Sequence, residues 1–475
     1  MKKKVYVLIV FFLAVIMAFS DKIILKTTFQ IAPPKYYIED NEVKGICYEI
    51  YEELNKRLEK YNIEIQWDGK FKNMTYITEE LSKGFIDIFI GIAKNDYREN
   101  IMNFSDFPLY SVTYMILTNK DFNKSLNELK LGVIKGTKTE QLFFEVTKNK
   151  NKAIEFENIE EAINPYLKNK IEGVFYNSLT LGYYYNKSLK KISKIVNMPM
   201  PKYYHYIGFS RKVSEDIKNI VDKEIKEIVI NGTVEKILEK YGLKEFAKPG
   251  NYLKLANVDW PPYEWYENGE WKGIDTEVLK RVFENMGFKV DIIYLNWLRV
   301  LDYIKKGIID GTFSLSVTDE RRKYMLFSEE PLSTGADVFI YKNKNINFED
   351  DISNYKCGYV KGFNYNDRLK DFNLQYYAVS DDIIGIKGFI NDRFDIYVID
   401  KNVALYYLKK FNYKGQVYFY PISKKNMYYI GLSRKNEFSE EIIKMFNEEL
   451  KRFKKTEEYR EILKKYNITY EDLWQ

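Results

Sequence analysis

Residues 206–212 read Tyr-Ile-Gly-Phe-Ser-Arg-Lys and residues 429–435 read Tyr-Ile-Gly-Leu-Ser-Arg-Lys, so one segment recurs after 223 positions (429 − 206 = 223). The same interval separates Asp87 from Asp310 and Arg98 from Arg321. Self-similarity over such a long interval indicates a duplicated domain rather than a solenoid, whose units reach about 50 residues. The sequence therefore predicts two homologous modules in tandem.

The boundary between the modules is expected near residues 247–251, Ala-Lys-Pro-Gly-Asn, where a helical pattern ends at a Pro-Gly pair. We assign residues 21–248 to the first module and 249–475 to the second. Short apolar strands, such as 131–134, alternate with amphipathic helices, such as 216–228. This alternation favours an α/β fold with mostly parallel sheets.

The first 20 residues have the pattern of a secretory signal peptide. Three lysines precede an apolar run, and Ala18-Phe19-Ser20 forms a small-x-small cleavage site. We expect cleavage and a periplasmic or secreted protein; the alternative is an uncleaved N-terminal anchor. No later stretch approaches 18 apolar residues, which predicts a soluble mature chain.

Charge and composition argue against several classes of protein. The net charge of +6 falls to +3 (6 − 3) without Lys2, Lys3 and Lys4, which is no nucleic-acid-binding footprint. Cys47 and Cys357 fall in different modules, so buried free thiols are expected. The single histidine, His205, has no neighbours at metal-ligand spacing, and we expect no metal, cofactor or histidine-based nucleophile.

Residues 314–321 carry the strongest binding signal. Ser314, Ser316 and Thr318 place three hydroxyls at alternate positions, and Arg321 follows. A guanidinium fork with nearby hydroxyls suits a small carboxylate, because paired charge-assisted bonds fix its position and plane. The alternative is that Thr318 caps a helix and Arg321 is a solvated charge.

Both modules resemble the bacterial extracellular solute-binding proteins of family 3, the polar amino-acid receptors of ABC uptake systems. The second module carries the resemblance in Pro261-Pro262-Tyr263, Gly273-Ile274-Asp275, residues 314–321, Phe327-Ser328 with Pro331, and residues 394–400. The resemblance implies tandem periplasmic-binding-protein type II-like modules, or Venus flytraps. Each would have two α/β lobes joined by two crossover strands, with second lobes at about 121–200 and 346–424.

The resemblance also implies a ligand pose in the second module. Arg321 would hold the α-carboxylate in a pocket lined by the three hydroxyl residues above. Asp400 would hold the α-ammonium from the opposite lobe, and Trp260 and Trp297 would form aromatic walls. The alternatives are that Asp400 caps the following helix and that Trp260 packs in the core.

The two modules are predicted to differ. Arg98 stands opposite Arg321, but Asn177 stands opposite Asp400, which removes the charged partner for an ammonium. The first module keeps a Gly-Thr pair ending at Thr137, where the second reads Gly362-Phe363. We therefore expect Arg98, Thr137 and Asn177 to bind a plain carboxylate, or the first module to bind nothing and act as a spacer.

The favoured function is an exported receptor, without enzymatic activity, that captures a small amino acid or related polar carboxylate in its second module. An ABC permease or a membrane sensor would receive the ligand, because the tandem arrangement also resembles sensing regions of some histidine kinases. One alternative is a dehydratase on the same fold, which needs a general acid in the cleft. Another is a noncatalytic envelope interaction protein with vestigial clefts.

Overall fold

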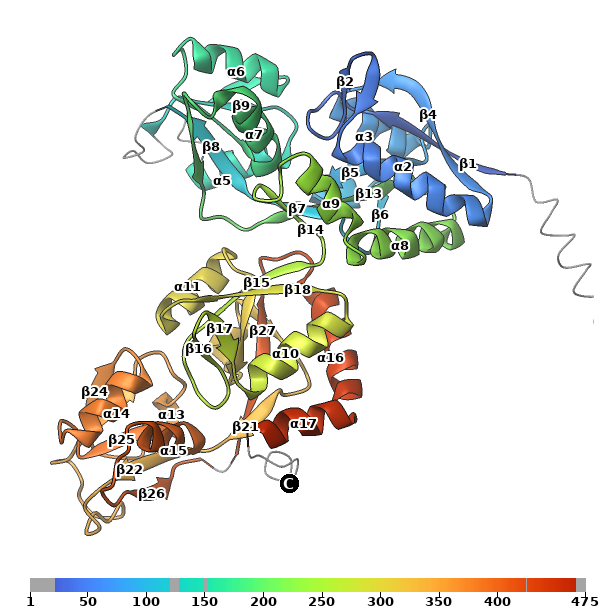
Figure 1. Ribbon diagram of the computed structural model, residues 1–475. Coiled ribbons are helices and arrows are strands. Elements are labelled where there is room, and N and C mark those ends of the chain that lie inside the picture. The colour runs from blue at the N-terminus through green and yellow to red at the C-terminus, as the bar shows by residue number, and fades with distance from the viewer. Residues whose placement is uncertain (1–21, 120–127, 149–152, 424, 467–475) are drawn as a thin grey trace, which may run out of the picture. The chain divides into compact units, whose positions relative to one another are not determined.

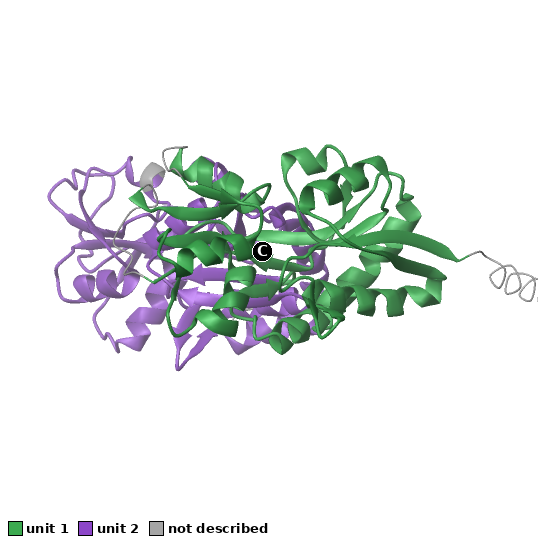
Figure 2. Cartoon of the chain, turned by 90° about the horizontal axis from the view of Figure 1, so that it is seen from above, with its two compact units in different colours: residues 1–251 green, residues 252–475 purple. Residues whose placement is uncertain are grey.

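The structure is a computed structural model that describes residues 22–119, 128–148, 153–423 and 425–466. The predicted signal peptide lies outside the described residues. The chain divides into two compact units, residues 1–251 and 252–475 (Figure 2). No helix in the described ranges is long and apolar enough to span a bilayer.

The first lobe of the first unit is built from both ends of that unit (Figure 1). Its strands are β1 (Ile23–Phe29), β2 (Tyr37–Glu39), β3 (Glu42–Lys44), β4 (Ile63–Phe71), β5 (Ile88–Ala93), β6 (Asn103–Phe104), β7 (Tyr110–Val112), β13 (Tyr203–Phe209) and β14 (Ala247–Pro249). Its helices are α2 (Ile46–Leu58), α3 (Met74–Lys83), α4 (Asp96–Glu99), α8 (Glu215–Ile230) and α9 (Thr233–Lys240). The main sheet has the order β14-β7-β13-β5, with β6 beside β13, and β1 pairs with β4.

The second lobe of the first unit is the middle of its sequence. Its strands are β8 (Tyr114–Thr118), β9 (Leu131–Ile134), β10 (Ile154–Phe156), β11 (Gly173–Asn177) and β12 (Lys194–Asn197). Its helices include α5 (Lys138–Thr147), α6 (Ile159–Leu167) and α7 (Ser178–Tyr184). The sheet order is β10-β9-β11-β8-β12.

The second unit repeats this plan. Its first lobe contains β15 (Tyr252–Asn257), β16 (Trp265–Glu267), β17 (Glu270–Lys272), β18 (Lys289–Tyr294), β19 (Gly311–Leu315), β20 (Met325–Phe327), β21 (Ser333–Gly335), β27 (Asn426–Ser433), α10 (Ile274–Asn285), α11 (Trp297–Lys306), α12 (Asp319–Arg322), α16 (Ser439–Phe453) and α17 (Glu457–Lys465). Its second lobe contains β22 (Asp337–Tyr341), β23 (Lys356–Val360), β24 (Gln375–Val379), β25 (Ile396–Asp400), β26 (Tyr418–Pro421), α13 (Asn366–Leu369), α14 (Asp382–Ile390) and α15 (Lys401–Lys410). The sheet orders are β18-β15-β19-β27-β20 and β24-β23-β25-β22-β26.

The sheets are mixed, which corrects the expectation of mostly parallel sheets. β9 pairs parallel with β10 and β11, and β15 pairs parallel with β18. The strands next to the lobe crossings, such as β8, β13 and β27, pair antiparallel with their neighbours. The reason is that a strand returning from the other lobe re-enters its sheet in the opposite direction.

Strand register confirms the duplication at the level of single residues. Tyr114 of β8 pairs with Asn177 of β11, and Asp337 of β22 pairs with Asp400 of β25. Both members of the second pair lie 223 positions after their counterparts in the first (337 − 114 and 400 − 177). Residues of the two units can therefore be compared position by position.

A repeated glycine fixes the first long helix of each unit. Gly273 has φ +116°, and a Cβ there would lie 2.2 Å from the carbonyl oxygen of Tyr263. Gly45 has φ +132°, and a Cβ there would lie 2.2 Å from the carbonyl oxygen of Lys35. Only glycine fits such a contact. The hydroxyls of Tyr241 and Tyr466, near the end of each unit, accept the backbone N–H of Gly45 and Gly273 at 3.1 Å.

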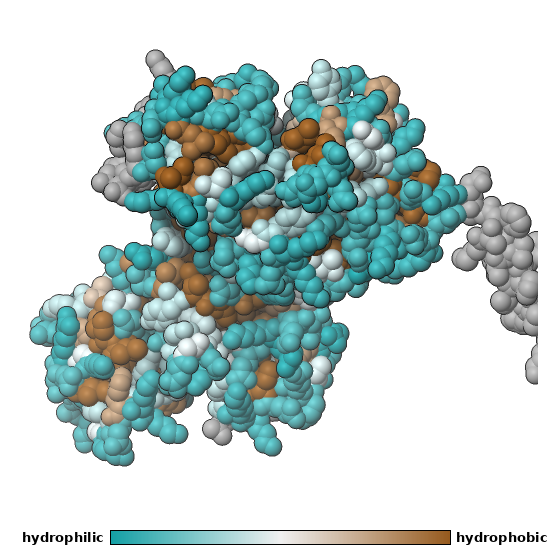
Figure 3. Space-filling model, turned by 45° about the horizontal axis from the view of Figure 1, so that its top comes forward, coloured by the Kyte–Doolittle hydropathy of each residue, from teal (hydrophilic) through white to brown (hydrophobic). Residues whose placement is uncertain are grey.

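Each unit has its own buried cores, and the visible surface is mixed. One cluster in the second lobe of the second unit gathers around Ile386, Phe389 and Val403, which are fully buried. Figure 3 shows mostly hydrophilic residues on the face drawn, with hydrophobic residues in separate groups. Cys47 and Cys357 are buried free thiols, as expected.

Candidate functional site

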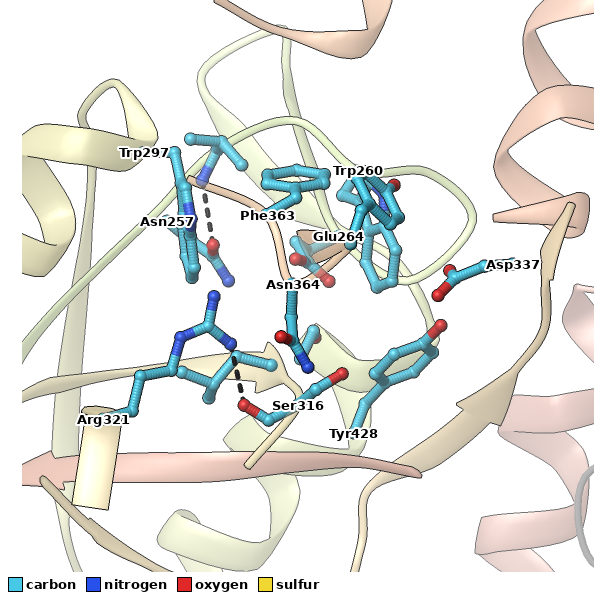
Figure 4. A pocket seen from close by; sticks show the side chains of 14 residues that line it. Asn257, Trp260, Glu264, Trp297, Ser316, Arg321, Asp337, Phe363, Asn364 and Tyr428 are labelled. Carbon is cyan, nitrogen blue, oxygen red and sulfur yellow. Dashed lines mark hydrogen bonds between the residues drawn. The ribbon is translucent and has the colours of Figure 1, made fainter. Parts of the chain in front are cut away.

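A pocket lies between the two lobes of the second unit and has an empty volume of about 480 Å³ (Figure 4). Its lining includes the predicted residues Trp260, Trp297, Ser314, Ser316 and Arg321. The other two predicted residues, Thr318 and Asp400, are not part of that lining.

Arg321 provides the positive charge of this pocket. It lies in α12, where its backbone N–H donates to the hydroxyl of the N-cap Thr318. The guanidinium is buried, and its Nη1 donates to the Ser316 carbonyl oxygen at 2.7 Å. Its central carbon lies 5.3 Å from the centre of the Trp297 ring, a cation–π distance. Backbone and ring thus hold the guanidinium toward the pocket.

The charge of Arg321 has no counter-ion within the described part of the chain, where its hydrogen bonds go to carbonyl oxygens. Burial lowers the pKa of Arg321 to about 10, so the guanidinium stays protonated at neutral pH. A buried charge without a partner destabilises a protein. The pocket therefore favours an anion next to Arg321.

The two lobes of this unit meet at the carbonyl oxygen of Gly362. Trp297 Nε1 donates to it at 2.9 Å, and Arg321 Nη2 donates to it at 3.3 Å. Gly362 lies between β23 and α13 in the second lobe, whereas both donors belong to the first lobe. The carbonyl thus occupies a position where the oxygen of a bound anion would receive the same two hydrogen bonds.

Glu264 is the pocket acid that the sequence reasoning missed. It lines the pocket, and Figure 4 shows its carboxyl group facing the same cavity as the Arg321 guanidinium. Only 1% of Glu264 is exposed, and its Oε2 has no hydrogen-bond partner among the described residues. Burial, and then the charge of Asp275, raise the pKa of Glu264 well above its usual value. Both causes disfavour the ionised form of Glu264 in the empty pocket.

The Ser314 hydroxyl serves a neighbouring acid. It donates to Asp275 Oδ2 at 2.7 Å, and the Ser333 hydroxyl donates to the same oxygen at 2.8 Å. Burial raises the pKa of Asp275 to about 7, while the two hydroxyls oppose this rise. Ser314 thus supports the pocket wall more than it offers a free donor to a ligand.

Asp337 is a second acid at the pocket edge, at the start of β22. Its carboxylate forms an ion pair with Arg368, and its backbone N–H donates to Ser423 Oγ at 2.8 Å. The charge of Asp337 is therefore compensated within the unit. Glu264 is the better candidate for contact with a cationic group.

Asp400 lies behind the pocket and caps α15, as the alternative interpretation held. Its Oδ1 accepts the backbone N–H groups of Asn402 and Val403 at 2.9 and 3.2 Å. Its Oδ2 accepts the Ala336 N–H at 3.0 Å and the Tyr428 hydroxyl at 3.0 Å. A carboxylate at the last strand residue before a helix is closest to the N–H groups of that helix, which explains its position.

The first unit has a corresponding pocket of about 440 Å³. Arg98, Thr137 and Asn177 all line it. Arg98 Nη1 donates to the Ala93 carbonyl oxygen at 2.9 Å, so one edge of its guanidinium is engaged. Thr137 caps α5 and Asn177 caps α7 through their side-chain oxygens. Arg98 is thus the group of these three that offers a charge to a ligand.

The family model of the bacterial extracellular solute-binding proteins, family 3, matches residues 23–244 and again residues 255–469. The chain belongs to this family. It contains two tandem solute-binding domains, one in each unit, and both inter-lobe pockets lie inside the matched regions.

Similar solute-binding proteins are named for amino acids. A "Probable histidine-binding protein" of Neisseria gonorrhoeae is 25% identical over 229 residues, which is 46% of this chain and 84% of that protein. "Arginine-binding extracellular protein ArtP" of Bacillus subtilis (strain 168) is 23% identical over 159 residues, 32% of this chain and 62% of that protein. The solved B. pertussis BvgS periplasmic domain is 13% identical with a TM-score of 0.39, covering 93% of this chain and 89% of that chain.

The two solute-binding domains have different residues at matching positions in or behind their pockets. Met74 occurs where the second domain has Trp297, and Asn177 occurs where it has Asp400. Trp297 supplies an inter-lobe hydrogen bond that a thioether cannot donate. The pair of domains therefore presents two chemically distinct sites.

Proposed function

We propose that the second domain captures a small molecule with both a carboxylate and an ammonium group, such as an amino acid, without changing it chemically. One observation carries this proposal: Arg321, which has no carboxylate partner among the described residues, and Glu264, whose Oε2 has no partner there, line one buried pocket. Two similar proteins are named for binding histidine and arginine, which agrees with this ligand class.

The ligand carboxylate would bind at Arg321. Arg321 Nη2 and Trp297 Nε1 both donate to the Gly362 carbonyl oxygen, so one oxygen can receive both bonds. A carboxylate is a stronger acceptor than a carbonyl, because charge-assisted hydrogen bonds are shorter and roughly twice as strong. The ligand would thus displace Gly362 and keep its donors satisfied.

The ligand ammonium would bind at Glu264. Burial disfavours the ionised form of its carboxyl in the empty pocket, where no cation of the described residues forms an ion pair with it. An ammonium group supplies that cation, and Glu264 then loses its proton as the ligand binds. Binding of an amino acid should therefore release a proton to solvent, whereas binding of a plain carboxylate should not.

Aromatic side chains would enclose the rest of the ligand. Phe363 from the second lobe contacts Trp260 and Trp297 edge to face, with ring centroids 6.3 and 5.8 Å apart. These contacts join the two lobes, as closure around a ligand requires. The expected side chain is small or apolar, because the wall that these rings form is apolar.

Delivery of the ligand is the second part of the proposal. A solute-binding domain that closes on its ligand presents a changed surface to a membrane partner. We infer that this partner is an ABC permease or a membrane sensor, reached from a periplasmic or secreted location. The family description as extracellular supports that location.

A second candidate function is a dehydratase activity on a cyclic carboxylic acid. Glu264 favours it, because a buried acid whose pKa is raised is a possible general acid, and its pocket also contains the Arg321 guanidinium. The two functions differ in outcome: a receptor returns its ligand unchanged, whereas a dehydratase consumes it. Incubation of the chain with each hit, followed by NMR of the small molecule, separates them.

A thermal-shift panel of amino acids on the mature chain tests the receptor function. A true ligand raises the melting temperature by mass action. The shift should vanish in Arg321→Ala and persist in Arg98→Ala, its matched counterpart in the first domain. An equal shift in wild type and Arg321→Ala would overturn the assignment of the carboxylate site.

A further inference from the structure

The first-domain pocket is lined by cations and by no acid. Its described lining residues include Lys35, Arg98 and Lys138, and none of them is Asp or Glu. Lys35 Nζ donates to Gln30 Oε1 at 3.1 Å and to the Gly91 carbonyl oxygen at 3.3 Å, both uncharged acceptors. Arg98 is likewise bonded to a carbonyl oxygen. Buried Arg98 and partly buried Lys35 thus share a cavity whose described lining contains no carboxylate.

His205 gives a second, independent sign of a ligand. It lines the same pocket, is 7% exposed, and its Nδ1 has no hydrogen-bond partner among the described residues. Burial, and then the charges of Lys35, Lys138 and Arg98, hold the pKa of His205 well below its usual value. Buried polar atoms are normally bonded, so this nitrogen fits a site that a ligand completes.

Position-by-position comparison shows that the two domains differ consistently in their acidic residues. Four carboxyls lie in or behind the second pocket, and each has a neutral counterpart in the first domain: Glu264 and Tyr36, Asp275 and Cys47, Asp337 and Tyr114, Asp400 and Asn177. Two neutral residues, Tyr263 and Asn364, have lysine counterparts, Lys35 and Lys138. Arg98 and Arg321 are the same in both. Each of these differences removes a carboxyl group or adds a lysine, so the first pocket has more cationic groups relative to acidic groups than the second pocket has.

The surroundings of the pocket leave a route for the ligand. A larger cavity of about 1650 Å³ shares Gln30, Lys35, Met74 and Tyr176 with it. The carboxylates of this outer cavity are already engaged, because Glu157 pairs with Lys135 at 2.9 Å and Glu160 accepts the Tyr184 hydroxyl. Of these two acids, Glu157 is compensated by an ion pair with Lys135, whereas the partner of Glu160 is an uncharged hydroxyl.

From these observations we propose that the first domain binds a small organic dianion without an ammonium group, of the dicarboxylate class. Arg98 holds one carboxylate and Lys35 holds the other, while His205 Nδ1 completes the polar contacts. An added ammonium group would face cations and find no acid in this pocket. The protein would then monitor or carry two different ligand classes at once, one in each domain.

Succinate and aspartate form a matched pair of probes, because they differ by one ammonium group. Titration calorimetry on the mature chain carrying Arg321→Ala, which silences the second pocket, should show that succinate binds at least tenfold more tightly than aspartate. The proposal is overturned if aspartate binds as tightly as succinate, or if neither binds. It is also overturned if inorganic phosphate or chloride competes as well as succinate, which would indicate adventitious anion binding.

Two variants keep the test independent of folding defects. Asn177→Asp is nearly isosteric, preserves the cap of α7, and restores the acid found in the second domain; it should weaken succinate binding at least tenfold. Lys35→Met should abolish succinate binding, whereas Lys56→Met, at an exposed position of α2, should leave it within twofold. Unchanged succinate affinity in Asn177→Asp and Lys35→Met would refute the proposed site. Because Arg98 and Arg321 can be removed separately, failure here is distinguishable from failure of the amino-acid site.

Discussion

Replacement of Asp275 by Asn should flatten the pH dependence of stability of the second domain. Asp275 is fully buried, and its pKa is raised from 3.8 to about 7. The folded state therefore keeps a proton that the unfolded state has already lost between those two values. Stability is highest at low pH and falls as the pH rises through this window.

The magnitude follows from the two pKa values. One pKa unit corresponds to about 1.4 kcal/mol, so the full cost above pH 7 is about 4 kcal/mol on the raised pKa of Asp275. About 1.7 kcal/mol of this cost is already present at pH 5, which leaves a difference of about 2.5 kcal/mol between pH 5 and 7.5. For a domain of this size that corresponds to roughly 5 to 10 °C in melting temperature.

Differential scanning calorimetry of the ligand-free chain at pH 5 and 7.5 measures this difference. The second-domain transition should fall with pH in wild type and fall less, by about 2.5 kcal/mol, in Asp275→Asn. Exposed Asp371→Asn is the control and should behave as wild type. A parallel pH dependence in wild type and Asp275→Asn would show that Asp275 is ionised in the folded protein, and would refute the reasoning about this buried cluster.

Two further predictions concern hydrogen bonds, one that occurs in both units and one in the second unit. Tyr241→Phe should lower the stability of the first domain only, and Tyr466→Phe that of the second only, each by about 1 to 3 kcal/mol of unfolding free energy. The reason is that each hydroxyl bonds a glycine N–H and a glutamate in its own unit. Calorimetry in which one variant shifts both unfolding transitions would contradict this. Trp297→Phe removes the Nε1 donor that bonds Gly362 in the empty pocket and would bond the ligand carboxylate after displacement. It should weaken ligand binding about tenfold in titration calorimetry, whereas unchanged affinity would show that Trp297 donates no hydrogen bond to the ligand.

The repeat made much of the fold predictable. A fixed interval of 223 residues paired Arg98 with Arg321 and Asn177 with Asp400, and strand register confirms the second pairing. Helix and strand positions followed from hydrophobic pattern: the helix expected at 216–228 is α8, and the strand expected at 131–134 is β9. Whether neighbouring strands pair parallel or antiparallel did not follow, because the hydrophobic pattern does not show where the chain crosses between lobes.

The acids of the pocket were less predictable than its cation. Asp400 and Glu264 both lie near element ends, where several conformations are open to a carboxylate. Glu264 enters the pocket because the chain folds back after Pro261-Pro262 and pairs its backbone with Trp260. Asp400 turns to the N–H groups of α15 instead. The orientation of each carboxyl group depends on contacts between segments that are distant in the sequence, and residue spacing does not reveal those contacts.

The pairing of Arg321 with Glu264 across one bound zwitterion is tested most directly by titration calorimetry with two ligands. These are the tightest-binding amino acid and its analogue in which hydrogen replaces the ammonium. Glu264→Gln should weaken binding of the amino acid at least tenfold and leave the affinity for the analogue within twofold. Arg321→Ala should abolish binding of both ligands. Equal effects of Glu264→Gln on the two ligands, or undiminished binding in Arg321→Ala, would contradict this pairing.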